Sequence, residues 1–260
     1  MWVPPDATDA TTDDYRFTVY ENRCSVQWSR TRRPFDEVLD EVLARTAASG
    51  RPTVRWWVHD DSEPADTAAR LTAAGFEHVE TVDVLALDLR GGAGPLVERL
   101  QVPADVEVRA SDDLADLERG AAVDAAVFDW PPPSRAILDH ELGLAQEGLA
   151  TGRWTSRQYL ALVDGEVRGH GGIGLAPGGL DGGLVARLWG GAVLPEARGR
   201  GAYRALLAAR CAFAVEQGAT LALVKGRVAT SAPVLRRAGF TAYGQERCYQ
   251  RHLPDGEPGA

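Results

Sequence analysis

The sequence predicts an α+β fold class, with a mixed and mostly antiparallel sheet flanked by helices. From residue 106 onward, the expected order is a strand, two helices, three antiparallel strands, a helix, a strand, a helix and a strand. The segment Gly91-Gly92-Ala93-Gly94-Pro95 has the composition of a linker between domains. A short pattern at a helix end also recurs before and after this linker, which favours two related domains.

The part before the linker begins with residues 1–14, whose Pro, Asp, Thr and Ala content is typical of a disordered lead-in. Residues 15–28 alternate apolar and polar side chains well enough for one or two strands. The other elements expected here are a helix over 34–49, a strand over 54–58, a helix over 64–74 and a strand over 79–89.

The part after the linker supplies the longer series of elements. Asp164-Gly165 between two apolar runs predicts a hairpin turn, and Ser134 is a natural N-cap for a helix. The expected elements are a strand over 106–109, helices over 112–126 and 134–150, strands over 159–163, 167–175 and 184–194, a helix over 202–217, a strand over 221–224, a helix over 231–238 and a strand to 252.

Five positions recur without gaps in the two parts, at a helix end followed by a strand. They are Leu71, Ala74, Gly75, Phe76 and Leu89, aligned with Leu235, Ala238, Gly239, Phe240 and Leu253. We predict a lead-in over 1–14, one domain over 15–92, a second over 104–253 and a tail over 254–260. The Arg/Gly loop described below has no counterpart before residue 54, so we expect the first domain to bind no cofactor.

Composition and charge argue against several classes of function. The chain of 260 residues has a net charge of −9 and no long basic run, so binding to nucleic acid is not expected. No apolar run reaches the ~20 residues that a membrane-spanning helix needs. Cys24, Cys211 and Cys248 form neither a disulfide framework nor a CxxC metal pattern. We therefore expect a cytoplasmic protein with buried thiols and no metal.

The segment 188–217 carries the main functional signal, because it is expected to form a strand, an Arg/Gly loop and a long helix. In the loop, Gly199 and Gly201 let the backbone approach a ligand closely, while Arg198 and Arg200 add positive charge. Amide groups at the start of the helix point outward at its positive end. The segment therefore predicts an anion site suited to phosphate.

Two common phosphate-binding motifs do not fit this loop. A Walker loop needs Gly-Lys-Ser/Thr, but Gly201 is followed by Ala202-Tyr203. A dinucleotide fingerprint needs a third glycine where Arg204 stands. The run from Arg198 to Tyr203, preceded by Val193-Leu194-Pro195, instead resembles the acetyl-coenzyme A loop of the GNAT acyltransferase superfamily. Tyr203 departs from the family pattern, in which a small residue is usual.

This resemblance implies the GNAT acyl-CoA N-acyltransferase fold in two tandem copies, of which the first is degenerate. It implies an N-acetyltransferase that transfers an acetyl group from acetyl-CoA directly to a primary amine. The pantetheine arm would lie between the strand over 188–194 and its parallel neighbour over 221–224, with an N–H near Gly191 to Val193 on the oxyanion. The residues implied to bind acetyl-CoA are Val193, Leu194, Arg198, Gly199, Arg200, Gly201, Ala202 and Tyr203.

The sequence leaves the catalytic groups open. The family often uses a tyrosine four residues before the Gly-Phe pair, but Leu235 stands there and has no proton to donate. Alternatives for the acid are water and three side chains nearby in sequence, Ser231, Tyr243 and Cys248. Candidates for the base are Asp129, Glu141 and His170, although a histidine on a strand is more often structural.

Other hypotheses compete with catalysis. A catalytically silent module that holds acetyl-CoA or CoA as an effector is consistent with the missing tyrosine, and a binder of phosphate esters or nucleotides would use the same anion site. The acceptor, a small-molecule or peptide amine, is not identified, because acceptor pockets are built from variable loops. Trp130 and the prolines after it either shape that pocket or only pack on the core. The first domain is either a rigid lid or the surface of a homodimer.

Overall fold

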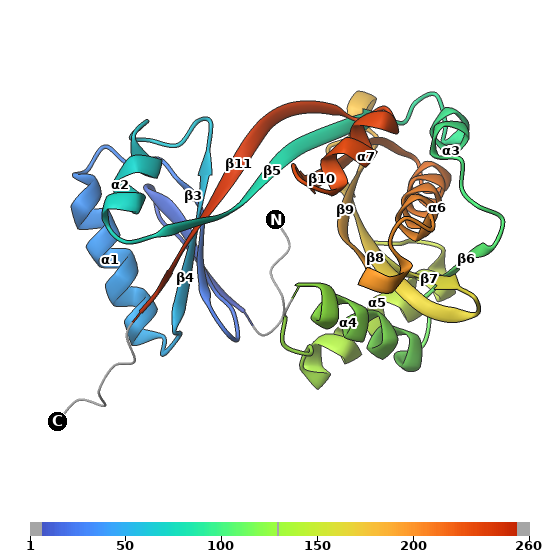
Figure 1. The fold of residues 1–260 in the computed structure, drawn as a ribbon, viewed down its shortest axis with the longest axis horizontal. Helices are drawn as coiled ribbons and strands as arrows, with labels where there is room; N and C mark the ends of the chain where they lie inside the picture. Colours follow the sequence, from blue (N-terminus) through green and yellow to red (C-terminus); the bar gives the residue numbers. More distant parts are fainter. Residues whose placement is uncertain (1–6, 129, 254–260) are drawn as a thin grey trace. The chain divides into compact units, whose positions relative to one another are not determined.

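The computed structural model describes residues 7–128 and 130–253 (Figure 1). The chain divides into two compact units, the first formed by Met1–Asp83 with Gly244–Ala260 and the second by Val84–Tyr243. Two long strands, β5 (Glu77–Asp88) and β11 (Thr241–His252), cross the points of division. This division does not coincide with the predicted domains over 15–92 and 104–253, since the end of the chain belongs to the first unit.

The first unit is a sheet with two helices. Its strands are hydrogen-bonded in the order β1-β2-β3-β4-β11. β11 runs antiparallel to β4, from Glu246 opposite His59 to His252 opposite Thr53. The other elements are β1 (Thr8–Thr11), β2 (Tyr15–Val19), β3 (Cys24–Ser29), α1 (Phe35–Ala48), β4 (Thr53–His59) and α2 (Thr67–Ala73).

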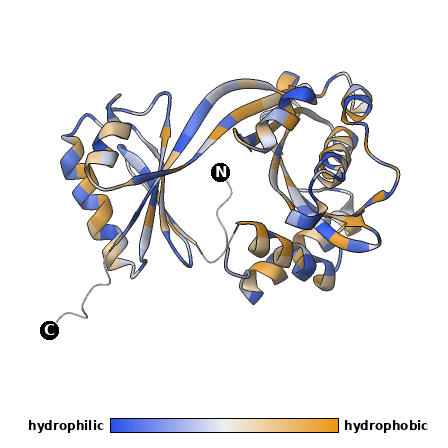
Figure 2. Ribbon diagram, viewed as in Figure 1, coloured by the Kyte–Doolittle hydropathy of each residue, from blue (hydrophilic) through white to orange (hydrophobic). Residues whose placement is uncertain are grey.

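The core of the first unit is built around the fully buried Trp56 on β4. Its ring lies 5.5 Å from that of Phe35 and 6.4 Å from that of Phe76, and its indole N–H donates to Ser29 Oγ at 3.1 Å. α1 covers this core with a face that includes the buried Val38, and the helix carries apolar and polar bands in Figure 2. The period-3.6 pattern of its apolar residues is what places them on one side.

One expectation for the chain ends changes in the structure. Residues 8–11, which fall inside the predicted disordered lead-in, form β1 and pair with β2 from Thr8 opposite Val19 to Thr11 opposite Arg16. Their backbone is stabilised by sheet hydrogen bonds that composition does not reveal. The predicted tail over 254–260 and residues 1–6 lie outside the described residues.

The second unit contains the other strands, in the hydrogen-bonded order β5-β10-β9-β8-β7-β6. The strands are β6 (Val106–Ala110), β7 (Ser156–Val163), β8 (Glu166–Pro177), β9 (Leu184–Val193) and β10 (Ala219–Arg227), together with part of β5. The helices are α3 (Gly94–Leu100), α4 (Leu114–Phe128), α5 (Arg135–Thr151), α6 (Ala202–Glu216) and α7 (Ser231–Arg237). This confirms the predicted mixed sheet flanked by helices.

Neighbouring residues of β8 point to opposite faces of this sheet, and different helices cover the two faces. His170 faces α4, where Gly120 leaves room for its ring; a Cβ at Gly120 would lie 2.6 Å from His170 Cδ2. Gly171 faces α6, where a Cβ would lie 3.0 Å from the guanidinium of Arg210. The sheet therefore separates α4 on one side from α6 on the other.

β9 is irregular along both of its edges. Against β8, the register shifts by a bulge, so that Gly171 is opposite Gly190 and His170 is opposite Ala192. Against its parallel neighbour β10, the ladder runs from Leu184 only to Leu188, which is opposite Val224. Both strands continue beyond that point, so they separate at the C-terminal end of β9 as the sequence analysis expected.

Several local predictions are confirmed in this unit. Asp164 and Gly165 both have positive φ, 54° and 78°, as the two-residue turn between β7 and β8 requires. Ser134 caps α5 by accepting the N–H of Ile137. The predicted linker is only partly a linker, because its last residues begin α3 at Gly94.

The repeated pattern forms the same helix end in both units. Gly75 and Gly239 have φ of 80° and 103°, which favour glycine. The N–H of Phe76 donates to the carbonyl of Leu71 at 3.0 Å, and the N–H of Phe240 donates to that of Leu235 at 3.1 Å. This is the 6→1 bond of a Schellman cap, so the repeat has a common physical cause. No helix among the described residues is long and apolar enough to cross a membrane.

Alanine substitution at two glycines of α5 tests how this helix packs in the second unit. Ala at Gly143, which has nothing near its Cβ position, should stabilise the protein by about 1 kcal/mol through helix propensity. Ala at Gly148 would instead place its Cβ 2.3 Å from the ring of Trp154, which packs edge-on against Phe213. We expect G148A to cost about 1–3 kcal/mol in urea unfolding, and an equal gain from both variants would contradict this packing.

Candidate active site

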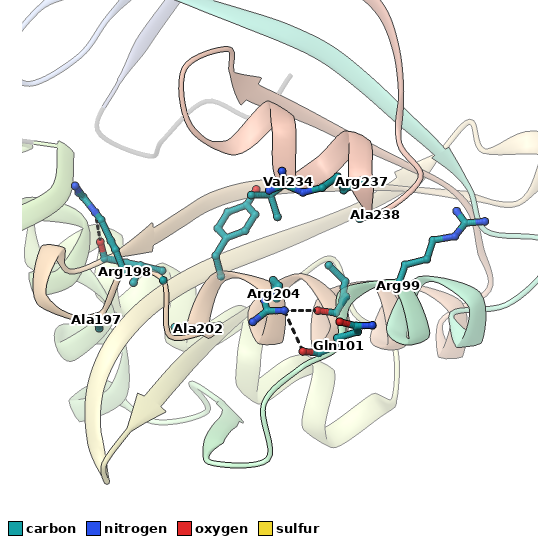
Figure 3. A pocket seen from close by; sticks show the side chains of 14 residues that line it. Arg99, Gln101, Ala197, Arg198, Ala202, Arg204, Val234, Arg237 and Ala238 are labelled. Atoms are coloured by element: carbon teal, nitrogen blue, oxygen red, sulfur yellow. Dashed lines mark hydrogen bonds between the residues drawn. The ribbon is translucent and has the colours of Figure 1, made fainter.

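A pocket of about 470 Å³ lies beside the start of α6 in the second unit (Figure 3). It is lined by residues from α3 and the segment after it, from the end of β9, from the Arg/Gly loop and from α7. The lining residues are Arg99, Leu100, Gln101, Val193, Ala197, Arg198, Gly199, Gly201, Ala202, Tyr203, Arg204, Val234, Arg237 and Ala238.

The loop that enters the pocket depends on two glycines. Gly199 has φ of 80° and Gly201, the residue before α6, has φ of 95°. Gly201 also packs closely, because a Cβ there would lie 2.5 Å from Pro103 Cδ. A side chain at Gly201 would be strained in backbone conformation and in contact, so the sequence needs glycine here.

The first amides of α6 form the anion-binding part of the pocket. α6 begins at Ala202, so the N–H groups of Gly201, Ala202 and Tyr203 have no acceptor within the helix. Two loop amides are already used, since Arg198 N donates to Pro195 O at 3.3 Å and Arg200 N to Ala197 O at 3.4 Å. The run of outward amides is therefore shorter than the predicted 198–203, but it lies at the positive end of a helix dipole and suits a phosphate group.

Four arginines add positive charge around these amides. Arg198 Nε donates to Val193 O at 3.3 Å, and Arg204 Nη1 donates to Leu100 O at 3.0 Å, as the dashed lines in Figure 3 show. Arg99 reaches the pocket from α3 and Arg237 from the last turn of α7 (Figure 3). The pocket therefore combines helix-dipole and side-chain charge for an anionic ligand.

Arg200 does not line the pocket, although the sequence analysis included it in the cofactor site. Its guanidinium pairs with Asp164 at 2.5 Å and with Asp105 at 3.7 Å. The hydrogen bond from Arg200 lowers the pKa of Asp164. Leu194 is also absent from the lining, while the other six predicted residues line the pocket together.

Tyr203 reaches from the start of α6 toward the bulge of β9 and toward α7. A Cβ at Gly191 would lie 2.9 Å from Tyr203 Cε2, so the ring packs on the main chain of the bulge. Its side chain interacts with that of Ser231, the first residue of α7. Burial raises the pKa of the Tyr203 phenol, which keeps the hydroxyl protonated at neutral pH.

The predicted catalytic candidates are not brought together. Ser231 touches Tyr203 and accepts the N–H of Arg227 at 2.9 Å. Tyr243 is 76 % exposed, while Cys248 is buried in the first unit, opposite Trp57 on β4. Leu235, in the family's tyrosine position, is fully buried.

The candidates for the base lie on the other face of the sheet from α6. His170 is buried against α4, with 2 % of its surface exposed, and Glu141 is 9 % exposed on α5. Asp129 lies outside the described residues. The described residues contain no cluster of three or more His, Cys, Asp or Glu side chains arranged to hold a metal.

Sequence reasoning missed the arginines that α3 and α7 bring to the pocket, Arg99 and Arg237. Arg99 lies between the predicted linker at 91–95 and the second predicted domain, where no element was expected, and a lone arginine in a short helix carries no motif. The one signal in the sequence was the spacing of Leu96 and Leu100, which are both buried. Their burial orients α3 so that Arg99 points outward.

Comparison with known proteins adds independent information. Residues 121–240 match the model of the acetyltransferase (GNAT) family. No curated protein matches the sequence. Solved structures are similar over nearly the whole chain, at identities that show the fold alone.

One similar structure is a GCN5-related N-acetyltransferase from Kribbella flavida, with 17 % identity, 98 % of this chain and 91 % of that chain covered, and a TM-score of 0.63. Another is a tandem GNAT protein from the clavulanic acid biosynthesis pathway, with 16 % identity, coverages of 98 % and 86 %, and a TM-score of 0.58. A GCN5-related N-acetyltransferase-like protein from Streptococcus suis has 12 % identity, coverages of 96 % and 89 %, and a TM-score of 0.58. With the loop, the pocket and the family match in agreement, residues 121–240 are a domain of the acetyltransferase (GNAT) family.

Proposed function

We propose that the protein is an N-acetyltransferase that transfers the acetyl group of acetyl-CoA to a primary amine. The observation that carries this proposal is the group of outward amides at the start of α6, surrounded by arginines in one pocket. A diphosphate fits such a site, because it accepts hydrogen bonds from both main-chain and guanidinium donors. Arg198, Gly199, Gly201, Ala202 and Tyr203 would hold it, while Arg200 would not, because its N–H donates to Ala197 O and its guanidinium pairs with Asp164.

The separation of β9 from β10 supports a place for the pantetheine arm. Beyond Leu188 and Val224 the two parallel strands no longer pair, so an extended ligand can bind main-chain groups there as an added strand does. In this arrangement, Val193 lines both the gap and the pocket. The thioester would then reach the bulge at Gly190 and Gly191, where a main-chain N–H stabilises the oxyanion as the amine attacks.

The thiolate that leaves needs a proton, and Tyr203 is the phenol in the pocket. Leu235 removes the donor that the family often places on α7. Tyr203 reaches the same neighbourhood from α6, where its side chain interacts with Ser231 on α7. We assign Tyr203 the role of proton donor, since burial raises the pKa of its phenol and keeps the proton on it at neutral pH.

A catalytically silent CoA-binding module is the second candidate function. Leu235 in place of the tyrosine favours it, since that substitution removes a common catalytic group while leaving the pocket intact. The two candidates agree on cofactor binding and differ only in turnover.

Acetyl-CoA should stabilise the folded protein through ligand linkage. At a hundred times its dissociation constant it contributes about 2.7 kcal/mol, which raises the Tm by several degrees. Differential scanning fluorimetry with acetyl-CoA, CoA and ATP measures this, and thiol release over a panel of primary amines separates enzyme from silent module. A Tm unmoved by millimolar acetyl-CoA would rule out both candidates, and ATP binding more tightly than CoA would favour a nucleotide binder.

Arginines at the pocket should contribute to CoA affinity according to position and not charge alone. The double variant R99A/R237A removes two lining guanidinium groups, and the loss of about 1.4 kcal/mol or more raises the Kd at least about tenfold. R236A is the matched control, because Arg236 is in the same turn of α7 but does not line the pocket. Calorimetry should give R236A a Kd close to that of the wild type, and equal weakening by all variants would indicate a non-specific charge effect.

The substitution Y203F tests the proton donor. It should lower kcat by about 10²-fold or more with the preferred amine, because the thiolate loses its acid. The raised pKa also predicts that wild-type kcat falls only at strongly alkaline pH, as the phenol ionises. This alkaline decrease in kcat should be absent in Y203F. The Kd for CoA measures any damage to the pocket; a kcat equal to the wild type would show that water protonates the thiolate.

A further inference from the structure

A buried chain of polar side chains crosses the second unit behind the bulge of β9. Asp124 on α4 lies 3.0 Å from His170 on β8, between Oδ2 and Nδ1. His170 Nε2 lies 2.9 Å from Gln158 Oε1 on β7, and Gln158 Nε2 donates to Glu141 Oε2 on α5 at 3.0 Å. All four residues are at most 9 % exposed. No step described above uses this chain.

The positions of these hydrogen bonds fix how many protons the chain holds. The amide of Gln158 gives its N–H to Glu141, so its carbonyl faces His170 and requires a proton on Nε2. Nδ1 lies 3.0 Å from Asp124 Oδ2, a contact at ion-pair distance without hydrogen-bond geometry, and a proton on Nδ1 gives this pair opposite charges. Two carboxyl groups and an imidazole therefore share one extra proton and carry a net charge of about −1.

Reversing the amide of Gln158 does not change this count. The proton then resides on Glu141, whose pKa is raised by burial, and a neutral His170 carries its proton on Nδ1, 3.0 Å from Asp124 Oδ2. In either arrangement the four side chains carry a net negative charge in the protein interior, which is costly unless an opposite charge or a proton compensates it. The buried guanidinium of Arg210 interacts electrostatically with Asp124 and offsets part of this charge.

Within this series of buried polar side chains, the atom that could accept a proton is Asp124 Oδ1. This atom is buried and makes no hydrogen bond with the residues that the structure describes. It lies 3.9 Å from the position of a Cβ on Gly190, in the bulge. Gly190 has no side chain to cover it from the β9 side. An unpaired carboxylate oxygen therefore borders the place where the proposed thioester would lie.

We propose that Asp124 is the base that takes a proton from the attacking ammonium group, with His170 as its positioning residue. This inference rests on the proposed acetyl transfer. Asp124 approaches the bulge from the α4 face, while Tyr203 approaches Gly191 from the α6 face. The proton acceptor and the proton donor thus lie on opposite sides of one irregular strand, where an amine and a thiolate would be separated in the transition state.

The protons of the reaction balance with these two groups. An ammonium group R–NH₃⁺ gives one proton to Asp124, directly or through one water, and becomes the nucleophilic amine. Its lone pair forms the C–N bond as the C–S bond breaks. Tyr203 gives its proton to the thiolate, and the second proton lost by nitrogen restores the phenol. The amide nitrogen keeps the third proton, and the network releases the first to solvent.

The charged neighbours of Asp124 come from three sides. His170 faces it from β8, and Glu141 acts through Gln158 from β7 and α5. Arg210 on α6 also interacts electrostatically with Asp124 from the other face of the sheet. The ring of Trp189 packs against His170 at 5.9 Å and shields the pair from water.

The test compares D124N with D116N. Asp116 lies on the same helix and is also buried, but it accepts bonds from Arg109 and Arg119 and has no part in the proposed site. With the amine from the panel that gives the highest turnover, D124N should lose about 10²–10³-fold in kcat and D124E should recover part of it. D116N should keep the wild-type kcat, and all three variants should keep the Kd for CoA.

The pH dependence of kcat, compared between wild type and D124N, gives a second readout. Wild-type kcat should rise with pH to a plateau, since a general base acts only in its unprotonated form, and D124N should lose this rise. A flat wild-type profile between pH 5 and 9, or equal kcat in D124N and D116N, would overturn the role of Asp124 while leaving acetyl transfer intact. Wild-type protein that binds acetyl-CoA but acetylates no amine would instead overturn the proposed function, and this role with it.

Discussion

The buried guanidinium of Arg210 holds the part of the sheet on which the proposed chemistry depends. It donates to the main-chain carbonyls of Gly172 on β8 and Trp189 on β9, at 3.2 and 3.0 Å, and to Leu206 in its own helix. These carbonyls lie beside the bulge, where a regular ladder is interrupted. Burial lowers the pKa of Arg210, which reflects the cost of removing its charge from water. Hydrogen bonds to several carbonyls, with the charge of Asp124 nearby, offset that cost and fix α6 against both strands.

The bulge and the anion site are coupled because one continuous segment forms both. β9 ends at Val193, the Arg/Gly loop follows, and α6 begins at Ala202. Arg210 anchors this helix two turns after its start, so the helix N-terminus cannot move independently of the bulge. A cofactor with a diphosphate at one end and a thioester at the other needs this fixed separation, since reacting groups must be positioned closely. The anchoring of α6 therefore fixes the distance between the proposed anion site and the bulge, where the chemistry is proposed.

The sequence anticipated those features that depend on local chemistry. The turn at Asp164-Gly165, the cap at Ser134 and the glycine-dependent loop before α6 follow from backbone preferences of single residues. The repeated helix ends at Gly75 and Gly239 are of the same kind, because a Schellman cap is a short-range structure. Each of these features involves hydrogen bonds between residues close in sequence, which a pattern can encode directly.

Contacts between residues that are distant in sequence could not be predicted from local patterns. The pairing of β11 with β4, the approach of Arg99 and Arg237 to one pocket, and the contact of Asp124 with His170 each link separate segments. None of these residues belongs to a motif, and their partners are selected by packing. The sequence by itself determined the fold class, the Arg/Gly loop and the family that the loop resembles. Only the tertiary structure decided which side chains meet around it, because burial and electrostatic pairing act between elements that chain order does not place together.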